Sequence, residues 1–98
     1  IEVSVYMSEK QNIYALLGNH LRKARVRKGL SGQELAAIIQ LSQQQVSRYE
    51  LGVNKLSLDK LIEIAILLEI DIHEITTMIA RQFEKERINS SELALASF

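Results

Sequence analysis

The chain has 98 residues, 47% of them hydrophobic, with no cysteine, proline or tryptophan and only four glycines. This length supports one compact domain and is too short for two. The lack of cysteine excludes disulfides and cysteine-based zinc or redox sites. No apolar run reaches the roughly 18–20 residues that span a bilayer. The formal net charge is zero, which taken alone argues against a nucleic-acid partner, and the scarcity of helix-breaking residues predicts an all-α fold.

The first predicted helix runs from about Asn12 to Lys28. It follows an N-terminal tail of residues 1–11, in which apolar and polar residues alternate. This alternation is compatible with a short strand or with a disordered segment. Gly29 supplies a left-handed C-cap for this helix. The apolar stripe of the helix consists of Ile13, Leu17, Leu21 and Ala24.

Two capping boxes start the second and third helices. Ser31 pairs with Glu34 in the first box and Ser42 with Gln45 in the second, and the third helix ends near Leu51, before a glycine. The inward residues of the second helix are Leu35, Ala36 and Ile39. Only about three residues separate these helices, so the sequence predicts a helix-turn-helix.

The fourth helix begins after Ser57, and the fifth begins after Asp71, which is expected to form a third capping box with Glu74. The fifth helix is expected to reach about Arg87, with a break at residues 89–91 and a short turn or a tail over residues 92–98. The expected inward residues of the fourth helix are Leu58, Leu61, Ile62, Ala65 and Leu68. The apolar stripe of the fifth is Ile72, Ile75, Ile79 and Phe83.

The outer face of the third helix is the candidate DNA-reading surface. At about 100° per residue, one arc of roughly 140° holds Gln43, Gln44, Ser47 and Arg48. Glutamine can pair bidentately with adenine and arginine with guanine, and these residues stand on the part of the helix that enters a major groove. Backbone amides at the start of the second helix, at Gly32 and Gln33, are expected to hold phosphates.

The charge distribution supports this interpretation better than the net charge does. Residues 17–60 contain eight cations and three anions, a net charge of +5, and the rest of the chain carries –5. Such asymmetry predicts one basic face and one acidic region.

From about Leu17 to Ile75, the order and spacing of short sequence fragments resemble the Cro/CI-like, or XRE, family of bacterial helix-turn-helix regulators. The residues that carry the resemblance are Leu17-Gly18, Leu21-Arg22, Arg25, Lys28-Gly29-Leu30-Ser31, Glu34-Leu35-Ala36, Ser42-Gln43, Val46-Ser47-Arg48-Tyr49-Glu50, Gly52, Ser57-Leu58, Leu61, Ile64-Ala65, Leu68 and Asp71. The resemblance implies a five-helix, lambda-repressor-like DNA-binding domain over residues 12–75, with residues 76–98 as a helical extension. The run from Gln43 to Glu50 also resembles small regulators encoded within fimbrial operons.

The resemblance further implies particular roles. Residues matching Gln43, Gln44 and Arg48 meet base edges in the family. Positions near phosphates match Ser42, Ser47, Asn54 and Lys55. An ion pair between Arg25 and Glu50 locks the recognition helix. The chain departs from the family pattern at two positions. Gln40 occupies a position that is usually glycine, so a positive φ there carries strain of about 1 kcal/mol. Gly32 replaces a glutamine that often contacts a phosphate in the family, so only its backbone amide can make that contact.

The apolar residues beyond the usual domain end predict a homodimer. The expected dimerisation residues are Met78, Ile79, Phe83 and Ile88. The leading hypothesis is therefore a cytoplasmic, nucleoid-associated repressor that binds a near-palindromic operator as a homodimer. The alternative is an antitoxin-type interaction module whose C-terminal extension clasps another protein, and a restriction–modification controller stays open as a third possibility.

No catalytic site, metal site or cofactor is expected. His20 and His73 lack ligand-spaced partners, and no nucleophile–base pair or phosphate loop occurs, so the chain is not expected to be an enzyme. Double-stranded DNA and a second copy are the expected partners, with no membrane and no small-molecule ligand.

Overall fold

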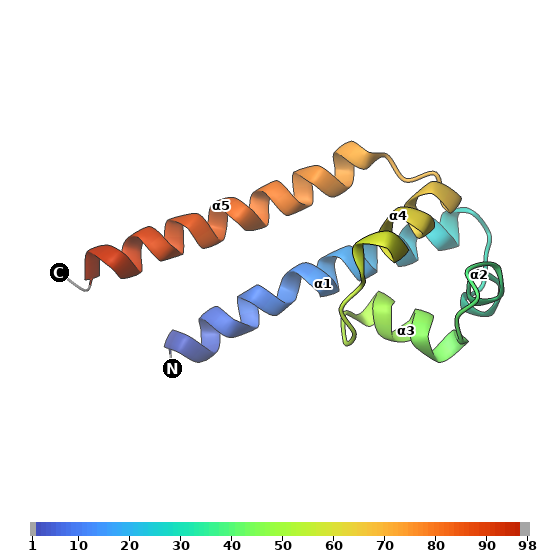
Figure 1. Ribbon diagram of the computed structural model, residues 1–98, viewed down its shortest axis with the longest axis horizontal. Coiled ribbons are helices and arrows are strands. Elements are labelled where there is room, and N and C mark those ends of the chain that lie inside the picture. Colours follow the sequence, from blue (N-terminus) through green and yellow to red (C-terminus); the bar gives the residue numbers. More distant parts are fainter. Residues whose placement is uncertain (1, 97–98) are drawn as a thin grey trace.

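The computed structural model describes the backbone of residues 2–96 and the side chains of residues 13–91. Over residues 2–96 the chain folds into five helices and no strand, which confirms the all-α prediction (Figure 1). The helices are α1 (Glu2–Arg27), α2 (Gly32–Ile38), α3 (Gln43–Leu51), α4 (Leu58–Leu67) and α5 (Ile72–Ala96).

The first and last helices are longer than the sequence predicted. Helix α1 begins at Glu2, so the expected tail or strand is wrong for residues 2–11, and α5 runs to Ala96 through the expected break at residues 89–91. Neither segment contains a proline or a glycine, and serine and asparagine only lower helix propensity without ending a helix. Residues 1, 97 and 98 lie outside the described part of the chain.

One apolar core joins all five helices. Three residues of the predicted α1 stripe are buried, namely Leu17, Leu21 and Ala24, whereas Ile13 is half-buried; the inward residues of α2 are buried as predicted. The core consists of Leu17, Leu21, Ala24, Leu35, Ala36, Ile39, Val46, Leu61, Ile64, Ala65, Leu68 and Ile75. Ala36, Ile39 and Val46 of this core flank the turn between α2 and α3, so burial of apolar area holds that turn in place.

Four of the described residues have a left-handed backbone and shape the turns; one of them is Gly52, after α3, with φ 77°. Gly29 follows α1 with φ 76°, as predicted for its C-cap, and Gln40 has φ 58° in the turn between α2 and α3. Glu69, at the end of α4, has φ 53°. A side chain in this region is strained by roughly 1–2 kcal/mol relative to glycine, so Gln40 and Glu69 both carry local strain.

Two expectations about α4 and α5 are wrong. Leu58 and Ile62 were expected to face inward, but they are 71% and 50% exposed. At the start of α5, the Asp71 carboxylate accepts a hydrogen bond from the amide of His73, whereas the Glu74 carboxylate lies 2.9 Å from His20 Nε2 on α1. The Glu74 carboxylate therefore lies beside α1 and does not complete the expected capping box.

The molecule is elongated, with principal extents of 53, 26 and 20 Å. Figure 1 shows the N-terminal half of α1 and the C-terminal half of α5 extending to the same side, away from the compact part that contains α2, α3 and α4. Within the described residues, no helix combines the length and hydropathy needed to cross a bilayer.

Candidate nucleic-acid interface

Helices α2 and α3 form the predicted helix-turn-helix. Residues 39–42 connect them, and the amide of Leu41 donates to the carbonyl of Ala36 across the turn at 2.9 Å. Val46 is buried and Leu41 packs against the core, so both fill the space beneath the turn. Lys60 on α4 donates its Nζ to the carbonyl of Ile39 at 3.3 Å, which ties the end of α2 to the rest of the domain.

Both predicted capping boxes at this motif are present. The Ser31 Oγ accepts from the Glu34 amide at 3.0 Å, and the Glu34 carboxylate accepts from the Ser31 amide at 2.9 Å. Ser42 and Gln45 make the same two contacts at the start of α3, at 3.1 and 2.9 Å. The hydrogen bonds with Ser31 lower the pKa of Glu34, chiefly because the Ser31 amide stabilises the charged form of the carboxylate. They also fix where each helix begins.

The outer face of α3 is polar and open to solvent. All four predicted base-contacting residues are exposed: Gln43, Gln44, Ser47 and Arg48. Val46 faces the opposite way into the core, so α3 is anchored on one side and free on the other. Gln45 uses its side-chain oxygen as a cap acceptor, which leaves that atom unavailable to a base edge.

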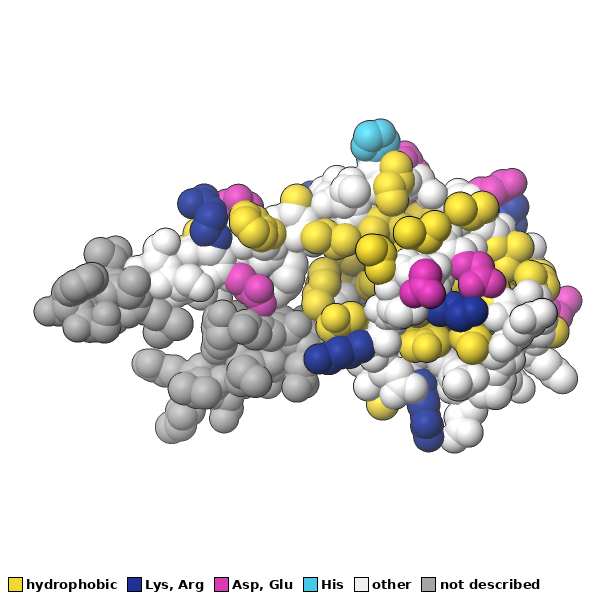
Figure 2. Space-filling model, in the orientation of Figure 1, with side chains coloured by type: hydrophobic (Ala, Val, Ile, Leu, Met, Phe, Trp, Pro, Cys, Tyr) yellow, Lys and Arg dark blue, Asp and Glu magenta, His cyan; other side chains and the backbone are white. Residues whose placement is uncertain are grey.

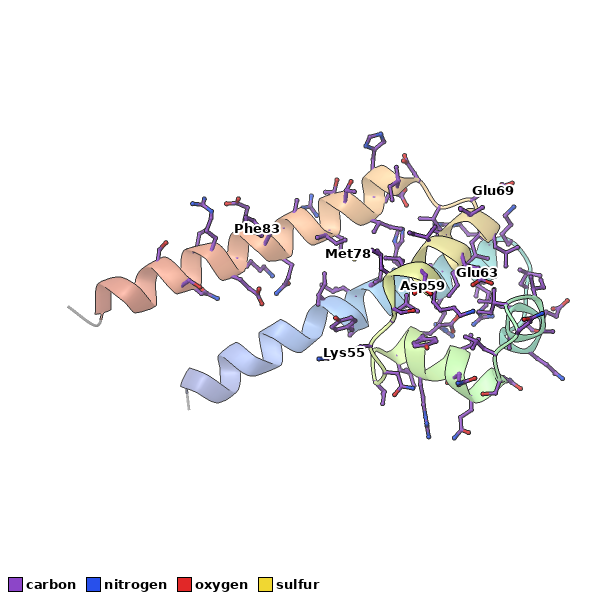
Figure 3. All side chains as sticks on the ribbon, in the orientation of Figure 1. Lys55, Asp59, Glu63, Glu69, Met78 and Phe83 are labelled. Atoms are coloured by element: carbon purple, nitrogen blue, oxygen red, sulfur yellow. The ribbon has the colours of Figure 1, made fainter. Side chains whose placement is uncertain are left out.

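The predicted phosphate positions lie at the starts of α2 and α3 and in the connection that follows α3. A Cβ built on Gly32 would lie 4.0 Å from Gln43 Cγ, so the starts of α2 and α3 are neighbours. Gln33 and Ser42 are exposed there. Asn54 and Lys55 lie in the connection from α3 to α4, where Asn54 is half-buried and Lys55 is exposed (Figure 3).

The ion pair between Arg25 and Glu50 fixes the far end of α3. Arg25 Nε and Nη2 donate to the two Glu50 carboxylate oxygens at 2.6 and 3.0 Å, and Nη1 donates to the carbonyl of Leu30 at 2.8 Å. The side chains are only 11% and 9% exposed. The hydrogen bond to Glu50 raises the pKa of Arg25. Arg25 thereby joins α1, the turn before α2 and the end of α3.

Two glycines bring the backbones of α1 and α3 into direct contact, a feature that the sequence did not reveal. A Cβ on Gly18 would clash with the carbonyls of Tyr49 and Glu50, and one on Gly52 would lie 2.5 Å from the backbone of Ala15. The available signal was a glycine inside a predicted helix, which usually has a packing or functional reason.

A second, apolar surface lies on α4 and α5. On α4, Leu58, Ile62 and Ile66 follow one another at four-residue spacing and are 71%, 50% and 73% exposed. Figure 2 shows apolar side chains spread across α4 and onto α5, and Figure 3 shows the acidic side chains Asp59 and Glu63 on α4. The sequence did not predict an exposed stripe on α4, because a heptad-like apolar pattern does not reveal how wide the buried arc is.

The predicted dimerisation residues do not share one face. Ile79 and Phe83 are exposed one turn apart on α5, whereas Met78 is half-buried against the core (Figure 3). Ile88 is exposed, but it follows Phe83 by five residues, which places it about 140° around the helix. We define the apolar face as Leu58, Ile62, Ile66, Ile72, Ile79 and Phe83.

Comparisons with known proteins agree with this geometry. Residues 21–75 match the HTH_3 family, described as helix-turn-helix. An uncharacterized HTH-type transcriptional regulator of Rickettsia conorii is 37% identical over 62 residues, covering 63% of this chain and 50% of that protein. A second such regulator, from Rickettsia prowazekii, is 37% identical over 62 residues, covering 63% and 48%. The chain spans about half the length of these curated relatives, and no solved structure matches it.

Proposed function

Because the chain belongs to the HTH_3 helix-turn-helix family, we propose that it is a sequence-specific DNA-binding regulator of transcription. It acts by occupying promoter DNA as a homodimer, without catalysis, cofactor or small-molecule ligand. The observation that carries the proposal is the outer face of α3, where four hydrogen-bonding side chains are exposed on a helix that caps and an ion pair hold in place.

In this proposal α3 enters the major groove and reads base edges. Gln43 and Gln44 suit adenine, Arg48 suits guanine, and Ser47 can donate to or accept from either. Phosphates are held around the groove by Gly32, Gln33, Ser42, Asn54 and Lys55 through backbone amides, hydroxyl and amide groups and one ammonium. The base contacts supply specificity, and the phosphate contacts supply salt-dependent affinity.

The apolar face supports a symmetric dimer. A stable interface buries roughly 800 Å² on each partner, which two or three side chains on α5 cannot supply. The six residues of the apolar face, which come from both α4 and α5, form a larger surface. A two-fold dimer presents two copies of α3 about one DNA turn apart, roughly 34 Å, and so selects a near-palindrome. Ile88 lies outside this face and contributes only if α5 packs on two sides.

The selection of binding sites from random-sequence DNA tests the proposal. The purified protein is expected to enrich one near-palindromic duplex, to bind it far more tightly than a scrambled duplex, and to lose affinity steeply as salt rises. Sedimentation equilibrium of the same sample is expected to give twice the mass of the chain. Selection that enriches no sequence would contradict the proposal.

Repression and a place in a fimbrial operon are the narrower parts of the proposal. The run from Gln43 to Glu50 supports the second by its resemblance to such regulators. Footprinting across the source genome, combined with transcript levels after deletion, tests both. The antitoxin alternative is not favoured, because the two relatives are named as transcriptional regulators.

A further inference from the structure

The backbones of α1 and α3 meet without an intervening side chain at Gly18 and Gly52, which we call the glycine seam. A Cβ on Gly18 would lie 2.5 Å from the carbonyl oxygen of Glu50 and would also clash with the carbonyl of Tyr49. Gly52 is left-handed, with φ 77°, and its Cβ would lie 2.5 Å from the backbone of Ala15. Every one of these neighbours is backbone, so no flexible side chain can yield.

Gly18 is the informative member of the seam, because it is a buried residue inside a long helix with ordinary helical backbone. Glycine weakens a helix relative to alanine, so the fold gains nothing locally from its presence. Gly52 differs, since its left-handed φ alone accounts for a glycine. What Gly18 provides is the close approach of α1 to the last turn of α3.

We infer that Gly18 is a positioning residue for DNA recognition, an inference that rests on the proposed function. The missing Cβ sets how closely α3 lies against α1. Ordinary van der Waals contact begins at 3.4 Å, so an alanine would move the end of α3 by about 1 Å. Because α3 is one short rigid helix, this displacement reaches Gln44 and Arg48. Specific contacts require positions held to within about 0.5 Å.

The neighbouring ion pair strengthens the inference. Glu50, whose carbonyl faces Gly18, is the residue whose carboxylate receives two hydrogen bonds from Arg25 of α1. A wider spacing between α1 and α3 therefore lengthens these bonds as well. Gly18 and Arg25 together fix the distance and direction of α3 from the same helix.

Gly18→Ala tests the inference, with Gly29→Ala as the matched control. Gly29, unlike Gly18, has a left-handed φ of 76°, and nothing lies within 4 Å of its Cβ position, so alanine there strains the backbone without moving α3. The readout is the ratio of affinities for the duplex selected by the wild-type protein and for a scrambled duplex. A loss of folded protein lowers both affinities equally and cancels in this ratio.

We expect Gly18→Ala to lower the ratio at least tenfold with helical circular dichroism retained, and Gly29→Ala to change it less than twofold. If Gly18→Ala folds poorly, the same change is made in a Glu69→Gly background, which relieves the left-handed residue after α4. An unchanged ratio in a folded variant would overturn the inference, and a chain that stays unfolded in both backgrounds would overturn it by making Gly18 a folding requirement. A wild-type ratio near one would instead remove the proposed function itself.

Discussion

The outer face of α3 and the apolar face of α4 and α5 are both exposed, yet they differ in the chemistry of their side chains and in the contacts that hold their helices in place. The α3 face carries amide, hydroxyl and guanidinium groups on a helix fixed by a capping box, a mostly buried ion pair and the glycine seam. The apolar face carries leucine, isoleucine and phenylalanine side chains, whose exposure to water is unfavourable. The first face is suited to hydrogen-bonded recognition and the second to burial against a partner.

Loss of the ion pair under the α3 face is expected to have the largest effect. Glu50→Ala leaves the Arg25 guanidinium mostly buried without its carboxylate, so we expect the free energy of unfolding to fall by about 3–5 kcal/mol. Urea denaturation measures this change. The control is Glu84→Ala, which breaks the exposed pair with Arg87 (2.8 Å) and is expected to cost less than about 1 kcal/mol. Equal losses in the two variants would contradict the assignment of Arg25–Glu50 as the support.

A charge on the apolar face separates dimerisation from folding. Phe83 is 64% exposed in the monomer, so Phe83→Lys is expected to leave the monomer's stability nearly unchanged and to weaken dimerisation by about 2–4 kcal/mol. Sedimentation equilibrium gives the dimer dissociation constant. Val26→Lys, at an exposed position on α1, is the control, and Ile88→Lys is expected to have a smaller effect than Phe83→Lys. A dimer unaffected by Phe83→Lys would assign the interface elsewhere.

Removal of a base-reading side chain is expected to act on specificity and not on the fold. Arg48→Ala should reduce affinity for the selected duplex by about 1–3 kcal/mol and leave the unfolding free energy unchanged, because this side chain is exposed. Fluorescence anisotropy at fixed salt measures the loss. Arg81→Ala, which removes an exposed cation from α5, is the control. An equal loss on scrambled DNA would show that Arg48 contacts only phosphates.

Relief of strain in the turn before α3 is expected to raise stability. Gln40 has φ 58°, so Gln40→Gly should increase the free energy of unfolding by about 1 kcal/mol while leaving specific DNA affinity unchanged. Thermal denaturation and anisotropy give the two quantities. A loss of specific binding would show that the glutamine side chain itself takes part in recognition.

The smallest expected effect concerns acid stability. Hydrogen bonds from Ser31 lower the pKa of Glu34 below its ordinary value of 4.5. A carboxylate with a lowered pKa in the folded state stabilises the fold above its unfolded-state pKa, and this contribution disappears as the pH falls through the folded-state value. Glu34→Gln should therefore flatten the decline in stability below about pH 4.5. Denaturation midpoints measured between pH 7 and pH 3 check this, and an unchanged pH profile would contradict it.

Local chemistry made much of the fold predictable. Serine followed three residues later by glutamate or glutamine marked the starts of α2 and α3, and the family pattern identified both the Arg25–Glu50 pair and the strained Gln40. These features depend on neighbours close in sequence or on positions that the family fixes. For the same reason, all four residues on the outer face of α3 could be named before their exposure was known.

Features that depend on distant packing were not predictable. Glu74 had a plausible local partner in Asp71, but it contacts His20, which the packing of α1 against α5 brings close. Leu58 and Ile62 follow an apolar spacing, yet only one arc of α4 reaches the core. The glycine at position 18 was visible inside the helix, but its close approach to the carbonyls of Tyr49 and Glu50, which belong to another helix, is encoded by no local pattern.

The most direct test of base reading by α3 pairs a protein change with a DNA change. Affinities of the wild-type protein and of Gln44→Ala are measured for the selected duplex and for duplexes in which each A·T pair is replaced in turn. If Gln44 reads one adenine, replacing that pair should cost the wild-type protein about 1–3 kcal/mol and the variant almost nothing. If the loss from Gln44→Ala and the loss from the base-pair replacement add at every position, Gln44 is coupled to no single base pair. That result would contradict base reading by α3 at this residue.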